Sequence, residues 1–487
     1  MGASGGSIAR RAVRGSVWTL GGYGAGQLLR FVSNVILARL LFPEVFGLMA
    51  LTFTFIQGLA MFSDVGIGPS IVQNPRGDEP RFLDTAWTIG VLRGVALWLA
   101  SVAIALPVAR IYGQPALLWL VPVAGLTALL NGLESTSIHW LRRHLRLEWV
   151  TSVDFGCQVL GMVATIALAV IGRRIVGPND LRLIWAPLGG NLIQSLARVA
   201  LTHAAMPGPR NSFLLDRELV RAQFRFGRWV FVSTLLAFLA SQSDRLLLAR
   251  LVTMAEFGVF GIAATLASIP TLAIEKVGGA VAFPALSRMA DRADFGQVYA
   301  RARTPLLLAG AAAASGLFAC GPPLVALLYD ARYADAQWMI QYLAAGAWLQ
   351  TLSGANGAAL LALGRVNVLA ATSAAKFGGI AVLFPLGYYL GGLRGALVGL
   401  ALSDLARYAV SAWGVSRFGM RPLRGDAGQS ALALGVALAG YGAARALESG
   451  GRGHFLALVA AATATGAVWA VLGLRYFREH RAHLAGG

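Results

Sequence analysis

Fourteen apolar runs of membrane-spanning length follow one another along the 487-residue chain, and they constrain its fold more than any other feature. A helix needs about 20 mostly apolar residues to cross a bilayer. Only 13% of the residues are charged, against about 25% in soluble proteins. The sequence therefore predicts an all-α integral membrane protein with about 14 transmembrane helices. The runs lie near 16–40, 45–72, 84–109, 115–137, 150–172, 183–206, 226–251, 257–283, 304–329, 335–361, 367–390, 395–416, 429–447 and 454–474.

The basic residues between these runs predict the orientation. The chain holds 41 Lys and Arg against 22 Asp and Glu, a net charge of +19. With the N-terminus in the cytoplasm, 24 of the 41 fall in cytoplasmic segments, 10 in the opposite loops and seven within spans. Positive residues stay in the cytoplasm because moving them across the membrane is unfavourable. Nucleic-acid modules instead cluster their basic residues on one face, so we expect no nucleic-acid partner and place both termini in the cytoplasm.

The chain repeats itself at a constant offset of 211 residues. Residues 35–47, VILARLLFPEVFG, match residues 246–258, LLLARLVTMAEFG. The same register pairs Trp18 with Trp229, Thr54 with Thr265, Asp64 with Glu275 and Gly68 with Gly279. Because the first span pairs with the seventh, an even number of spans separates them, and the halves are predicted to be parallel repeats.

This repeat sets the predicted domains. Residues 1–206 form an N-terminal lobe of six helices, and 207–225 a cytoplasmic connection. Residues 226–420 form a C-terminal lobe of six helices, and 421–487 add two helices and a basic cytoplasmic tail. Two facing lobes would leave a cavity between them.

Several motifs resemble the polysaccharide transport (oligosaccharide flippase) family of the multidrug/oligosaccharidyl-lipid/polysaccharide exporter superfamily. The most specific is the segment Ile36 to Gly47, ILARLLFPEVFG; Asp64 to Gly68 and Leu141 to Leu147, LRRHLRL, add to it. The resemblance covers roughly residues 10–420. It implies outward flipping of undecaprenyl-pyrophosphate-linked oligosaccharide across the bacterial inner membrane for exopolysaccharide, capsule or O-antigen. It also implies alternating access around a basic cavity, with a polysaccharide polymerase and export machinery as possible partners.

Basic residues inside the spans are the candidate substrate-binding groups. A charged side chain at mid-helix costs about 2.5–3.5 kcal/mol on insertion scales and by default marks a pathway. Arg can grip phosphate oxygens with two parallel hydrogen bonds, which suits a pyrophosphate. The alternative is that these residues pair with neighbouring acids and hold helices together, as Asp404 and Arg407 could. The strongest candidates are Arg30, Arg245, Lys276 and Lys376, followed by Arg93 and Arg407.

Acidic residues inside the spans form a second group of candidates. Asp64 and Glu275 are equivalent in the two repeats, and Asp244 precedes Arg245. They could bind a coupling cation or proton, or could brace the cationic cavity. Glycines with GxxxG spacing, Gly22 and Gly26 among them, are interpreted as helix-packing positions.

Other functions fit less well. Cys157 and Cys320 lie in apolar surroundings without a Cys/His cluster, so neither a metal site nor a disulfide framework is expected. No P-loop occurs, and no cofactor is expected. A cation-coupled drug exporter of the same superfamily would favour an acidic cavity. A membrane polysaccharide polymerase, the enzyme alternative, usually carries a large outer loop, but the longest here is near 173–182. The sequence therefore predicts a transporter whose partners are a lipid-linked oligosaccharide and membrane lipids, and no catalytic residues.

Overall fold

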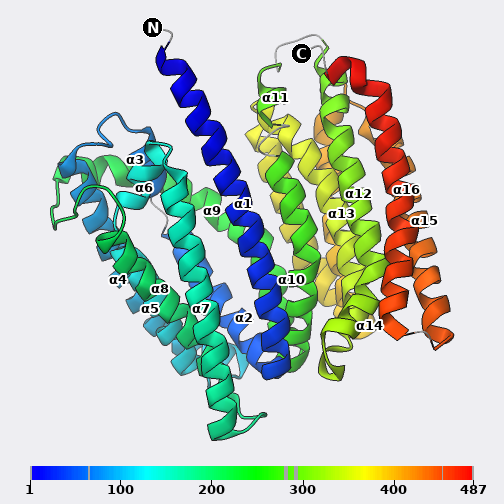
Figure 1. Ribbon diagram of the computed structural model, residues 1–487, viewed down its shortest axis with the longest axis horizontal. Coiled ribbons are helices and arrows are strands. Elements are labelled where there is room, and N and C mark those ends of the chain that lie inside the picture. The colour runs from blue at the N-terminus through cyan, green and yellow to red at the C-terminus, as the bar shows by residue number, and fades with distance from the viewer. Residues whose placement is uncertain (1–2, 64–65, 279–282, 290–293, 452, 485–487) are drawn as a thin grey trace. The chain divides into compact units, whose positions relative to one another are not determined.

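The computed structural model describes residues 3–63, 66–278, 283–289, 294–451 and 453–484, and every regular element in these ranges is a helix (Figure 1). Two compact units divide the chain, Met1–Gly258 and Val259–Gly487. The first unit holds α1 (Ala3–Leu40), α2 (Pro43–Phe62), α3 (Ile67–Gln73), α4 (Pro80–Tyr112), α5 (Leu117–Leu133), α6 (Ser137–Arg143), α7 (Leu147–Val176), η1 (Leu181–Ile184), α8 (Trp185–Ala204) and α9 (Arg217–Leu251).

The second unit begins within α10 and ends with α16. It holds most of α10 (Met254–Val277), then α11 (Phe283–Ser287), α12 (Phe295–Leu328), η3 (Ala331–Tyr333), α13 (Ala336–Ala362), α14 (Val366–Ser416), α15 (Pro422–Ser449) and α16 (Gly453–Leu484). The contact-defined first unit contains α9, whereas the predicted N-terminal lobe ends at residue 206; the lobe boundary stays a prediction.

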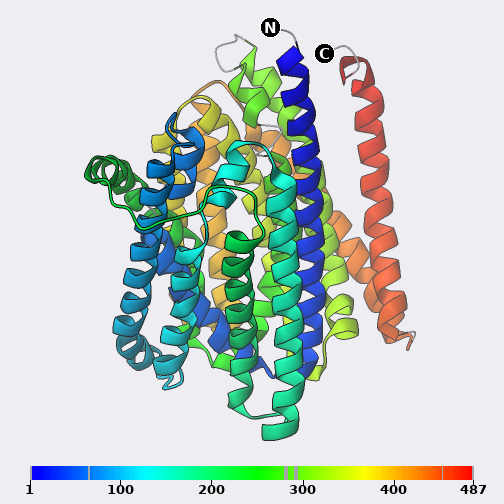
Figure 2. The same ribbon diagram turned by 60° about the vertical axis from the view of Figure 1, so that its left-hand side comes forward.

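Within each unit, helices that follow one another in sequence pack together, and so do some that are far apart in sequence. In the first unit α1 packs along α7, α4 on α5 and α7 on α8, and Figure 2 shows the long α1 and α7 side by side. In the second unit α13 packs between α12 and α14, and α15 and α16 pack on α12. The prediction that Gly22 and Gly26 mediate packing is confirmed, since a Cβ there would lie 2.1 Å from Thr151 and 2.9 Å from Gln158 of α7.

Helix ends follow local chemistry. Proline occupies a first-turn position of α2, α4 and α15, where its missing N–H removes no helical hydrogen bond. Asp216 caps α9, and its carboxylate accepts hydrogen bonds from the amides of Glu218 and Leu219. The first-turn prolines and the Asp216 cap therefore mark where these four helices begin.

Helix boundaries follow the 211-residue repeat. Helix α1 ends at Leu40 and α9 at Leu251, while α2 begins at Pro43 and α10 at Met254, so both pairs of boundaries share that offset. Within the first unit the equivalent glycines Gly47 and Gly258 lie against each other's helix start. A Cβ on Gly47 would lie 2.0 Å from the Met254 carbonyl oxygen, and one on Gly258 would lie 1.9 Å from that of Pro43. The contact is therefore reciprocal.

Helix α14 is a hairpin of two helical segments. Gly391 and Gly392 have non-helical backbone angles, and Gly392 has φ +59°, a conformation that glycine adopts without strain. Gly387 lies before the break and Gly395 after it, and a Cβ on either glycine would lie 2.2 Å or less from the other's carbonyl oxygen. This break separates the two predicted spans 367–390 and 395–416.

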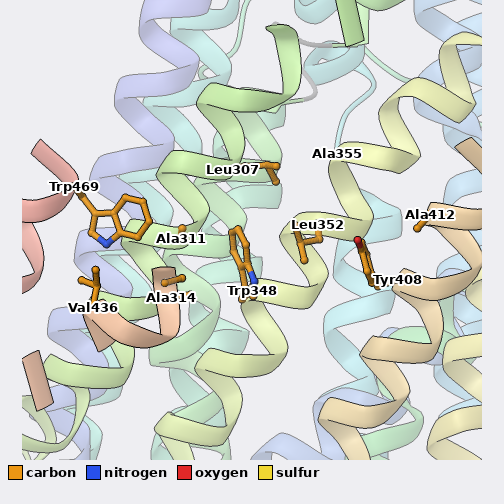
Figure 3. Close-up of a cluster of buried hydrophobic side chains, with 11 residues drawn as sticks. Leu307, Ala311, Ala314, Trp348, Leu352, Ala355, Tyr408, Ala412, Val436 and Trp469 are labelled. Atoms are coloured by element: carbon orange, nitrogen blue, oxygen red, sulfur yellow. The ribbon is translucent and has the colours of Figure 1, made fainter. Parts of the chain in front are cut away.

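Figure 3 shows a buried cluster that joins α12, α13, α14, α15 and α16 of the second unit. Its indole N–H groups find partners: Trp348 donates to Ser430 and Trp469 to Ser315, both at 2.8 Å. Next to it, Arg303 of α12 makes a bidentate ion pair with Asp426 of α15 at 2.6 Å, and Tyr408 donates a hydrogen bond to the same carboxylate. These contacts fix α15 to the rest of the unit.

Eight described helices are long and apolar enough to cross a membrane, and nine if the bent pair α5 and α6 counts as one span. Described helices lie in all fourteen predicted runs, and α14 contains two of these runs. The all-α membrane architecture is thus confirmed, while the count of fourteen spans stays a prediction.

Candidate functional site

The first unit contains a broken helix. Helices α5 and α6 form an apolar pair bent by 55°, and three residues, Glu134 to Thr136, separate them. A break frees backbone groups that lipid cannot satisfy, so broken helices occur where protein or a water-filled cavity surrounds them. In transporters such breaks commonly present binding groups.

Side chains from two other segments hold this break. The Leu133 carbonyl accepts a hydrogen bond from His203 Nε2 at 2.8 Å, and the Ser135 amide donates to Thr202 Oγ1 at 3.3 Å, both on α8. From the segment between α8 and α9, Asn211 Nδ2 donates to Thr136 Oγ1 at 2.6 Å. Its Oδ1 accepts from Ser135 Oγ at 2.7 Å. The segment that connects the two repeats is therefore tied to the break.

A cavity of about 640 Å³ opens beside the break. It lies among α2, α3, α4, α5 and α6, and its walls combine apolar helix faces with a few polar groups. The polar and charged side chains lining it include Gln73, Arg93, Asn131, Glu134, His139 and Arg142. Two guanidinium groups face one carboxylate, so the lining carries a net positive charge with His139 neutral.

Arg93 holds the end of α2. Its Nε donates to Ser63 Oγ at 2.8 Å and its Nη2 to the Ala60 carbonyl at 2.7 Å. A cation at a helix C-terminus satisfies free carbonyls and complements the helix dipole. Arg93 therefore combines a place in the cavity lining with a structural role.

Arg142 and Arg143 of the LRRHLRL motif have different contacts. Arg143 binds the carbonyls of Ile71, Val72 and Asn74 at 2.7–3.0 Å and the Asp78 carboxylate at 3.0 Å, which secures the end of α3. Arg142 lines the cavity, is exposed, and makes no side-chain hydrogen bond or ion pair with any residue the structure describes. Arg142 is therefore available to an anionic ligand.

A second charged cluster lies behind the break. Arg198 of α8 contacts Glu134 through Nε at 2.9 Å and Asp154 of α7 through Nη2 at 3.2 Å. Glu134 belongs both to this cluster and to the cavity lining. Two carboxylates thus share one guanidinium.

The other predicted residues of the first unit lie apart from this cavity. Arg30 lines a separate cavity of about 400 Å³ between α1, α7 and α8, where its Nη1 lies 3.4 Å from Gln27 Oε1. Asp244 and Arg245 are half-buried on α9. Of the predicted cations in this unit, Arg93 alone lines the cavity beside the break.

In the second unit, Lys376 is an ion-pair partner. Its Nζ lies 2.9 Å from Asp404 Oδ1, and Gln350 donates to the other carboxylate oxygen at 3.2 Å. The sequence allows Asp404 to pair with Arg407, three residues further along the helix, but its salt bridge is with Lys376. Arg407 lines a cavity of about 400 Å³ with Gln350 and Thr372, and Lys276 is exposed on α10.

Two predicted acids lie outside the described positions, Asp64 entirely and Glu275 with its side chain. No group of His, Cys, Asp or Glu able to hold a metal occurs in the described part of the chain. The predicted cations fall in both units, and a cavity shared between the units stays a prediction.

Sequence reasoning missed the roles of Glu134 and Arg142. Arg142 counted only as a cytoplasmic positive residue, and Glu134 lay within a predicted span without being singled out. The available signal was the polar triplet Glu134-Ser135-Thr136 close to the end of an apolar run, followed by two arginines.

The family described as "Polysaccharide biosynthesis protein" matches residues 36–337, more than half of the chain. The chain belongs to this family. Among curated relatives, the succinoglycan biosynthesis transport protein ExoT of Rhizobium meliloti is 26% identical over 72% of this chain and 71% of its own length. The lipopolysaccharide biosynthesis protein WzxC of Escherichia coli is 20% identical over 82% and 79%.

Solved structures extend the comparison to the fold. The inward closed conformation of the lipid II flippase MurJ superposes with a TM-score of 0.70 at 11% identity, over 96% of this chain and 99% of that one. An inward-facing multidrug resistance MATE transporter gives 0.64 at 17% identity, over 81% and 94%. This family member therefore has the helical transporter fold of the superfamily that the sequence resembled, and is a multi-pass membrane protein.

Proposed function

We propose that this chain flips undecaprenyl-pyrophosphate-linked oligosaccharide outward across the bacterial inner membrane by alternating access, for export of exopolysaccharide, capsule or O-antigen. The carrying observation is Arg142, which makes no hydrogen bond or ion pair with any described residue and lines a positively charged cavity in an apolar helical bundle. A diphosphate needs such a cation because hydrocarbon cannot replace its water of hydration. The named relatives in succinoglycan transport and lipopolysaccharide biosynthesis support the same cargo class.

The proposed orientation puts this cavity where loading occurs. The excess of basic residues in alternate loops favours cytoplasmic termini, and the loop after α6 is then cytoplasmic. Lipid-linked units exported outward must enter from that face. The activity is transport, so no residue is assigned a catalytic role.

The cation-coupled drug exporter is the weaker candidate. The MATE structures support it through fold alone. A cavity for cationic drugs would carry net negative charge, whereas two arginines face a single glutamate in the cavity beside the break.

Replacing Arg142 tests the proposal. A charge-assisted hydrogen bond contributes about 1.5–3 kcal/mol, so Arg142→Ala should lower flipping of a lipid-linked diphosphate donor in proteoliposomes roughly tenfold or more. Arg110→Ala is the matched control, because Arg110 is an exposed arginine at the far end of α4. Equal flipping by both variants, or transport of lipophilic drug cations in place of the donor, would refute the proposed function.

A further inference from the structure

The three charges behind the break do not balance. Glu134 and Asp154 both contact Arg198, from the break and from α7, so the cluster carries one negative charge when both acids are ionised. The side chain of Glu134 is 16% exposed and that of Asp154 is 37% exposed, and Asp154 Oδ1 lies 3.2 Å from Arg198 Nη2. Two like charges around one cation favour binding of a proton, and Glu134 is the less exposed of the two acids.

Arg142 beside the cluster offsets part of this negative charge without making an ion pair with a described residue. From α6, Arg142 has no carboxylate partner of its own among the described residues, and it lines the cavity together with Glu134. On α8, His203 donates to the Leu133 carbonyl, which fixes that nitrogen as a donor. The charged or titratable groups around the cluster are Arg93 on α4, His139 and Arg142 on α6, Cys157 on α7, and His203 on α8.

A proton suits the site better than a metal ion. The Arg198 guanidinium already lies between the two carboxylates and would repel a second cation. No set of three ligands from His, Cys, Asp and Glu occurs in the described ranges. A proton needs only one carboxylate oxygen.

We propose that Glu134 and Asp154 form a proton-binding site whose occupancy is linked, through Arg142, to the anion in the adjacent cavity. The proton comes from solvent and forms an O–H bond on one carboxylate. An anion bound to Arg142 withdraws the positive charge that offsets the cluster, so it favours the protonated form. By reciprocity the proton tightens binding of the anion. This inference rests on the proposed function for the identity of the anion, but not for the proton site itself.

The break offers a path from this site to the connection between the repeats. Glu134 is followed by Ser135 and Thr136, and both bind Asn211 of the segment between α8 and α9. A change of charge at Glu134 therefore acts one residue away from the contacts that tie this segment down.

Infrared difference spectroscopy of the full-length chain in lipid nanodiscs tests the proton site without cargo. When the pH is lowered from about 8 to about 5.5, a range above the one in which exposed carboxylates titrate, we expect the C=O band of a protonated carboxylic acid to appear. Glu134→Gln or Asp154→Asn should abolish or shift it, and Glu44→Gln, at an exposed acid of α2, should leave it unchanged. An absent band, a band that persists in both cluster variants, or a response to Na⁺ in place of H⁺ would overturn the site.

Inorganic pyrophosphate tests the linkage. It should raise the midpoint pH of the band in the unaltered chain, and Arg142→Ala should keep the band but lose this rise. A midpoint that pyrophosphate leaves unchanged would overturn the linkage. A titrating cluster in a protein that does not flip the lipid-linked donor would refute the proposed function and leave the proton site standing.

Discussion

Two arginine–aspartate pairs of the second unit differ in their exposure to solvent. The Arg303–Asp426 pair is buried, with side chains 8% and 3% exposed, whereas Arg332 and Asp330 are 38% and 39% exposed. A buried pair that loses one partner leaves an uncompensated charge, but an exposed pair does not.

We therefore expect Asp426→Ala to destabilise the protein by about 3–5 kcal/mol. Asp330→Asn, which removes the exposed ion pair and keeps a capping side chain at the start of η3, should change stability by less than about 1 kcal/mol. Thermal unfolding in detergent measures both. The double variant Arg303→Met with Asp426→Leu should recover most of the loss, because it removes both charges; a double variant as unstable as Asp426→Ala would contradict this account.

Lys376 can be tested in the same way. Asp404 is 1% exposed and its Oδ1 lies 2.9 Å from Lys376 Nζ, so Lys376→Met should lower both the melting temperature and export. Lys376→Met with Asp404→Leu should restore the melting temperature. Export restored along with it would show that Lys376 acts through this pair; export still lost would assign Lys376 to the cargo path.

At the scale of the helix, the α14 hairpin depends on glycines without side chains to separate its arms. Gly395→Ala would place a Cβ 2.0 Å from the Gly387 carbonyl oxygen, and we expect a loss of about 1–3 kcal/mol or more from overpacking. Gly378→Ala, in the same helix with nothing within 4 Å, should be neutral or slightly stabilising because alanine favours helix. Unfolding curves of the two variants measure this difference in stability. Equal stability of the two variants would contradict the close approach of Gly387 and Gly395.

The sequence predicts the helices well because apolar length and proline or glycine punctuation are local signals. The break of α14 at Gly391 and Gly392, and the shared boundaries of α1 and α9, follow from such signals. The break after Leu133 was missed because its reason is not local. Partners on α8 and near Asn211 stabilise it from about 70 residues away along the chain.

At the scale of the whole molecule, charge asymmetry predicts the topology. Alkaline phosphatase fusions should be active after residues near 110 and 332, in predicted outer loops, and inactive after residues near 143 and 421. Green fluorescent protein fusions should give the reverse pattern. Active phosphatase at the cytoplasmic positions would invert the orientation and move the Arg142 cavity to the other face.

Site prediction was weaker than fold prediction for a physical reason. A charged residue within a span indicates a special environment but not which partner satisfies it. Lys376 was predicted to bind cargo and has a carboxylate beside it, whereas Arg142 was assigned to a loop and lines a cavity. Only tertiary contacts separate these two cases.

The reciprocal contact of Gly47 and Gly258 also bears on the origin of the chain. Each glycine lies against a carbonyl that occupies the same place in the other repeat. A half-length ancestor pairing with a second copy of itself would have made this contact twice from a single codon, so one mutation there would have struck both sides at once. In this chain the two glycines have separate codons, so a substitution at one of them disturbs one side of the contact and leaves the other side as it is.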